Sequence, residues 1–151
     1  MVDFYHFPTI NFNKKRQFLT IASGPVIIND KKEFLLHRAE STNKFQFSGG
    51  RWDDSKSPID NAIFRPFEDL GVHVEIIGEV EPFVIQDKIQ REGKEEILVL
   101  IHYLANIKEG SKPVKGNFGW FSSKEIIEME KRNELSSPNI SLACDYFINL
   151  K

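Results

Sequence analysis

The residue types best suited to chemistry gather in one segment, between a glycine pair and Gly71. Gly49 and Gly50 form the pair, and the carboxylates Glu68 and Asp69 follow shortly before Gly71. Glycine lets a backbone approach a ligand closely, and carboxylate oxygens are hard ligands of the kind that Mg²⁺ takes. The first interpretation of this segment is therefore phosphate or metal chemistry. The plain alternative is that the two carboxylates are exposed helix residues without a function.

A helix is predicted between the glycine pair and Gly71. Ser57 can cap its start, Pro58 suits the first helical position, and Gly71 is typical of a helix end. Pro66 conflicts with this prediction, because proline in a helix interior removes a hydrogen bond and costs about 3 kcal/mol or more. We therefore expect a kink, or a helix whose first part ends near Arg65.

Runs of β-branched and aromatic residues predict strands around this helix, at 18–28, 33–38, 72–77, 80–89, 97–107 and 119–122. Turn residues make the first two strands a hairpin, with a bulge or an edge at Gly24–Pro25 because proline cannot donate to a ladder. A second hairpin is predicted around the glycine-containing turn 90–94. The unbroken apolar run 97–105 is typical of a central strand buried on both faces.

Two further helices are predicted near the C-terminus. Ser122 and Glu125 form a capping-box pattern, and the last helix begins near Pro138. The order of strands, helix, strands and two helices predicts an α/β (α+β) fold with a mixed sheet between helices. The length of 151 residues predicts one domain over 18–151, preceded by an apolar N-terminal arm over 1–17.

Composition excludes several classes of protein. A net charge of −2, from 20 basic and 22 acidic residues, argues against bulk binding to nucleic acid or anionic membranes. The single cysteine, Cys144, rules out an intramolecular disulfide, fits a reducing compartment and is expected to be a buried, inert thiol. With no signal peptide and no apolar run of about 20 residues, a cytoplasmic protein is expected. The histidines share no zinc-ligand spacing, and His102 is expected to be a core residue.

The segment from Gly50 to Val72 resembles the Nudix box, written G-x5-E-x7-R-E-U-x-E-E-x-G-U with U a bulky apolar residue. Gly50, Glu68, Gly71 and Val72 match without a gap, and Asp69 is a conservative match. Three flanking segments are also similar to family patterns, so the resemblance extends over about 18–150; they are Leu35–Arg38, Phe45–Gly50 and Trp120–Ile126.

This resemblance implies a Nudix-like α/β/α sandwich and hydrolysis of a nucleoside diphosphate linked to another group. In such a reaction Mg²⁺ or Mn²⁺ bridges the diphosphate oxygens. It implies Glu68 and Asp69 as the catalytic and metal-binding carboxylates. The residues expected to contact a small-molecule substrate are Arg38, Gly49, Gly50, Trp52, Lys56 and Arg65. A homodimer is left open, as is a late carboxylate from Glu79, Glu81, Glu95 or Glu96.

Three charged positions of the box differ: Lys56 and Arg65 replace glutamates, and Phe64 replaces an arginine. The two acidic-to-basic changes should make the site repel Mg²⁺ and attract phosphate. One hypothesis is that Lys56 and Arg65 stand in for a metal as phosphate contacts. The alternative is an ion pair between Arg65 and Asp69 one turn later. Function stays divided between a metal-dependent hydrolase and a nucleotide-binding or protein-interaction module that needs no cofactor.

Overall fold

The computed structural model describes residues 18–52 and 55–150, so the arm predicted over 1–17 lies outside the described residues. This part of the chain contains strands and helices in the predicted order, which confirms the mixed α+β fold class. Their bounds are β1 Phe18–Ile27, β2 Glu33–Arg38, β3 Phe45–Gln46, β4 Gly50–Arg51, α1 Pro58–Leu70, β5 Val74–Ile76, β6 Phe83–Arg91, β7 Lys94–Ile107, β8 Phe118–Ser122, α2 Ser123–Lys131 and α3 Asn139–Ile148.

The strands form two sheets instead of one. The larger sheet has the order β4-β1-β7-β5, and β6 pairs with β7 beside β5. It is mixed, because β1 runs parallel to β7 whereas β4, β5 and β6 pair antiparallel. The smaller sheet is antiparallel, in the order β3-β2-β8.

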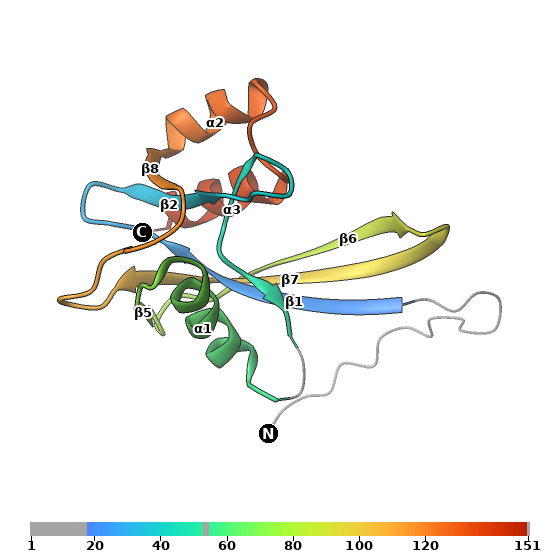
Figure 1. Ribbon diagram of the computed structural model, residues 1–151, viewed down its shortest axis with the longest axis horizontal. Coiled ribbons are helices and arrows are strands. Elements are labelled where there is room, and N and C mark those ends of the chain that lie inside the picture. Colours follow the sequence, from blue (N-terminus) through green and yellow to red (C-terminus); the bar gives the residue numbers. More distant parts are fainter. Residues whose placement is uncertain (1–17, 53–54, 151) are drawn as a thin grey trace.

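Helix α1 lies on one side of the large sheet, and α2 and α3 lie on the other side (Figure 1). The register that pairs Gly24 with His102 turns the side chains of Ser23 and His102 to opposite faces. Ser23 contacts α1 on one face, and His102 contacts Asn139 of α3 on the other. The small sheet, α2 and α3 share one hydrophobic cluster with β1 and β7, and α1 shares a second cluster with β5.

The hairpin predicted from the first two strands is wrong. The turn forms, with Lys32 at φ 63°, but β1 and β2 meet only at a single bridge between Ile28 and Phe34. Beyond it β1 pairs along its whole length with β7, and β2 joins the small sheet. β4 pairs with β1 only at Ala22 and Ser23. At Pro25, β1 therefore has a partner in this sheet only on the β7 side, which is the edge position expected for a proline.

Helix α1 is continuous through Pro66, so of the two expectations, a kink or a first part that ends near Arg65, the second is wrong. Its start is as expected, because the Ser57 side chain accepts a hydrogen bond from the Asp60 amide. Its end is also as expected, since Gly71 has φ 69° and its amide donates to the carbonyl of Phe67. Two well-formed ends and a buried apolar face hold the helix together across the proline.

The remaining local predictions are confirmed with one exception. The turn between β6 and β7 has both Glu92 and Gly93 at positive φ, Ser122 and Glu125 form a full capping box, and Cys144 is buried. The exception is β7, which is only half-buried over residues 97–101 instead of buried on both faces. None of the helices in the described ranges is long and apolar enough to cross a membrane.

Candidate functional site

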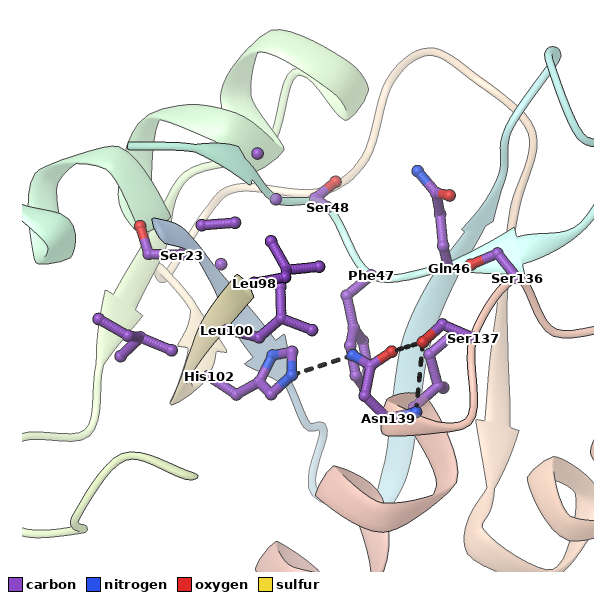
Figure 2. A pocket seen from close by; sticks show the side chains of 16 residues that line it. Ser23, Gln46, Phe47, Ser48, Leu98, Leu100, His102, Ser136, Ser137 and Asn139 are labelled. Carbon is purple, nitrogen blue, oxygen red and sulfur yellow. Dashed lines mark hydrogen bonds between the residues drawn. The ribbon is translucent and has the colours of Figure 1, made fainter. Parts of the chain in front are cut away.

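A cavity of about 270 Å³ opens between the large sheet, the Phe47–Gly50 segment and the start of α3 (Figure 2). Its volume is just below the range of about 300–1,000 Å³ typical of small-molecule sites. The lining is apolar along the sheet and polar near α3. The residues that line it are Ala22, Ser23, Gly24, Gln46, Phe47, Ser48, Gly49, Gly50, Leu98, Leu100, Ile101, His102, Ser136, Ser137, Asn139 and Ile140.

The polar end of the cavity is built around the Asn139 amide. Its Nδ2 lies 3.0 Å from Nε2 of His102, and its Oδ1 accepts a hydrogen bond from the Ser137 hydroxyl, as Figure 2 shows. Burial lowers the pKa of His102 from 6.5 to about 4, so the ring is neutral at pH 7 and its Nε2 accepts from the amide. The amide is thereby fixed, and it retains one N–H and one lone pair for a ligand.

The Phe47–Gly50 segment lies against β1 because glycines permit the approach. A Cβ on Gly24 would be 2.5 Å from the Ser48 carbonyl oxygen, and one on Gly49 would be 3.2 Å from the Ser23 carbonyl oxygen. The buried side chain of Asn61, on α1, also binds β1 and the Phe47–Gly50 segment. Its Nδ2 donates to Oγ of Ser23 at 2.9 Å and to the carbonyl of Gly50 at 3.1 Å. This side chain therefore ties α1 to β1 and β4.

Replacing Asn61 with alanine should lower the free energy of unfolding by about 1 kcal/mol, because two polar groups lose a hydrogen-bond partner. Urea denaturation measures this change. Asp60→Ala is the matched control on the same helix turn, since Asp60 is exposed and its side chain is not used in the tie. An Asn61→Ala variant as stable as Asp60→Ala would contradict the tie.

Arg65 of α1 contacts the backbone turn around Gly49 and Gly50, which we call the glycine turn. Its Nη2 donates to the Arg51 carbonyl at 3.0 Å, and its Nη1 is 3.4 Å from Oε1 of Glu68. The guanidinium rests on Gly50, where a Cβ would lie 2.7 Å from Cζ of Arg65. The predicted ion pair with Asp69 is therefore wrong, because Arg65 pairs with Glu68 three residues on. Oδ2 of Asp69 lies instead 3.9 Å from Nε2 of His37.

The structure places the predicted site residues on two sides of the glycine turn. Gly49 and Gly50 line the cavity, whereas Glu68 lines a separate groove together with Phe64. Lys56 lies next to that groove, its Nζ 4.7 Å from the centre of the Phe64 ring. The remaining two have local contacts: Trp52 Nε1 donates to the Lys56 carbonyl, and the Arg38 guanidinium lies over Phe45.

No protein-family model matches the sequence, and no curated protein matches it. Solved structures do match. The E. coli ORF135 protein matches with a TM-score of 0.65 and 17% identity, over 87% of this chain and 90% of that chain. A C. elegans Ap4A hydrolase gives 0.63 and 18%, over 86% and 96%. A Nudix hydrolase from Nitrosomonas europaea gives 0.59 and 16%, over 84% and 86%.

The fold is that of the Nudix hydrolases. Identities this low establish the fold alone, so the chemistry rests on the side chains. In a Nudix fold the α1 carboxylates would hold a divalent cation, and here the donor set does not fit one. A guanidinium lies between Glu68 and the glycine turn. Among residues 18–52 and 55–150, no three His, Cys, Asp or Glu side chains form a group that could hold a metal ion.

Several residues of the cavity were missed by the sequence reasoning. Asn139, Ser137, Leu98 and Leu100 were not predicted as site residues, and His102 was predicted only as a core histidine, which its burial confirms. The one signal in the sequence is a polar residue directly after Pro138 at a predicted helix start. That pattern is equally typical of a helix cap, so it does not point to a cavity.

Proposed function

We propose that this protein binds a nucleotide carrying a diphosphate group, with the base in the cavity and the phosphates beside Gly50 and Arg65. The observation that carries the proposal is the position of Gly50. It lines the cavity on one side and supports the Arg65 guanidinium on the other. A ligand whose flat apolar part fills the cavity therefore has its charged part next to a fixed cation.

The cavity has the chemistry that a base requires. Leu98 and Leu100 offer an apolar floor, and the Phe47 ring packs edge-on against His102, with the two ring centroids 5.5 Å apart. Asn139 supplies a donor and an acceptor at the polar end, and such an amide can pair with adjacent polar atoms on the edge of a base. With its orientation fixed by His102 and Ser137, the amide loses little entropy on binding.

The phosphate side is equally suited to an anion. Arg65 is still partly accessible, with 28% of its side chain exposed. A planar guanidinium can take two phosphate oxygens at once. Its contact to Glu68 is long at 3.4 Å, and Glu68 is half-exposed, so this surface pair is worth about 0–1 kcal/mol. A phosphate can therefore replace Glu68 at Nη1 at little cost.

Hydrolysis of the diphosphate is the second candidate. It is favoured by the names of the structural neighbours, which include an Ap4A hydrolase, and by the place of Glu68 and Asp69 on α1 beside the turn. Phosphate release and nucleotide cleavage across a panel of nucleoside diphosphate derivatives, with Mg²⁺ and with Mn²⁺, tests this candidate. Turnover that Glu68→Gln abolishes would establish the hydrolase, and turnover unchanged in that variant would place the active site elsewhere.

Filling the cavity should block the proposed binding. Isothermal titration with ADP-ribose and the common nucleoside diphosphates should show at least about tenfold weaker binding to Leu100→Trp, equal to about 1.4 kcal/mol. The matched control is Val84→Trp, because Val84 lies on the neighbouring strand with 54% exposure and does not line the cavity. Equal binding by both variants, or no binding of any nucleotide to the wild type, would contradict the proposal.

A further inference from the structure

The guanidinium of Arg65 occupies a place among oxygen atoms. Nη2 donates to the Arg51 carbonyl at 3.0 Å, and Nη1 is 3.4 Å from Oε1 of Glu68. The cation thus bridges a backbone carbonyl of the glycine turn and a helix carboxylate. Carbonyl and carboxylate oxygens are also the ligands that Mg²⁺ and Mn²⁺ prefer. Here the Arg51 carbonyl and the Glu68 carboxylate contact the Arg65 guanidinium instead of a metal ion.

A divalent ion and this guanidinium cannot share the position. An ion bound to Glu68 would lie within a few ångströms of Nη1, because that nitrogen is already 3.4 Å from the carboxylate, and like charges at such separations repel strongly. Asp69 offers no alternative ligand pair, since its carboxylate faces His37 at 3.9 Å. The positive charge of the Arg65 guanidinium therefore occupies the position beside Glu68 where a metal cation would lie.

The Arg65 guanidinium lies directly against Gly50. A Cβ at this position would lie 2.7 Å from Cζ and 2.8 Å from Nε of Arg65, so a side chain added there would push the end of the flexible arginine out of its present place. Nε is buried there without a hydrogen-bond partner among the described residues. The guanidinium thus lies close on the turn, and with 28% of the Arg65 side chain exposed it remains accessible to an anion.

We propose that Arg65 is a tethered cation that replaces the divalent metal of this fold, so that the phosphate group is bound without a metal ion. As far as the ligand is concerned, this inference rests on the nucleotide-binding function proposed above. The part that concerns the metal does not, because it predicts the affinity of the protein alone for a divalent ion. Arg65→Glu should create a metal site, since it removes the cation and adds a carboxylate one turn before Glu68.

The test is a titration of the full chain with MnCl₂ alone, followed by the electron paramagnetic resonance of free Mn²⁺. R65E should bind Mn²⁺ at least about tenfold more tightly than the wild type, a change of about 1.4 kcal/mol. Lys124→Glu is the charge-matched control, because Lys124 is exposed at the start of α2, and it should leave Mn²⁺ affinity unchanged. Wild-type affinity equal to that of R65E would overturn the inference.

Nucleotide titrations in EDTA and in Mg²⁺ complete the test. The wild type should bind equally in both, whereas R65E should lose binding in EDTA. Arg65→Gln, which removes the charge without adding a carboxylate, should weaken binding in EDTA at least about tenfold, and it carries the test if circular dichroism shows R65E to be unfolded. Wild-type binding that requires Mg²⁺ would overturn the inference. If no nucleotide binds at all, the proposed function fails. The Mn²⁺ titration still tests whether Arg65 takes the place of the metal ion.

Discussion

Replacing Gly24 with alanine is expected to lower the free energy of unfolding by about 1–3 kcal/mol, the usual cost of an added group in a packed place. The new Cβ would lie 2.5 Å from the Ser48 carbonyl oxygen and 2.9 Å from Cα of Gly49. Both atoms belong to the backbone, so no side chain can rotate out of the way. The Phe47–Gly50 segment must move off β1, and we expect nucleotide binding to weaken together with stability.

The control for Gly24→Ala is Gly78→Ala, because a Cβ on Gly78 would meet nothing within 4 Å. That variant should stay within about 0.5 kcal/mol of the wild type, as surface substitutions usually do. Urea denaturation followed by circular dichroism gives both free energies. If the two variants were equally stable, the close packing of the glycine turn on β1 would not be what positions the cavity.

Acid should destabilise the protein through His102. Burial lowers its pKa from 6.5 to about 4, and the groups packed against it, Asn139, Phe47 and Phe83, are uncharged. Between pH 6.5 and about 4 the unfolded chain therefore binds a proton that the folded chain does not. As the pH is lowered through this window the free energy of unfolding decreases, and His102 accounts for up to about 3 kcal/mol of that decrease.

Urea denaturation between pH 7.5 and 4.5 measures this pH dependence. His102→Gln should remove the part of the slope that His102 contributes, because glutamine does not titrate. His73→Gln is the control, since His73 is exposed and its ring stacks on the exposed Phe67 ring. It should keep the part of the slope that His102 contributes. Identical slopes in all three proteins would mean that His102 is not held neutral by its surroundings.

Local structure could be predicted where the deciding interaction is local. Ser57, Pro58 and Gly71 fix both ends of α1 within the helix itself, and Ser122 with Glu125 does the same for the start of α2. Each signal involves residues no more than a few positions apart. For the same reason the β6–β7 hairpin was predictable from its turn.

What failed depends on contacts between segments far apart. β1 was expected to pair with β2, its neighbour in sequence, but its longest pairing is with β7, in parallel register over ten residue pairs. No turn signal encodes such a pairing. Asn139 becomes a site residue only when the fold brings α3 beside β7. On α1, positions three and four after Arg65 are equally close neighbours, so the choice of Glu68 over Asp69 was decided by where the Gly50 turn holds the guanidinium.

The glycine turn beside α1 is proposed to bind a diphosphate through Arg65 without a metal. A crystal structure of the complex with ADP-ribose, or with whichever nucleoside diphosphate binds most tightly, grown in EDTA, tests it most directly. We predict phosphate oxygens at about 2.7–3.2 Å from the Arg65 nitrogens and the base between Leu98, Leu100 and Asn139. Phosphates that bind only with a divalent ion held by Glu68 and Asp69, or a ligand bound away from Gly50, would contradict the account.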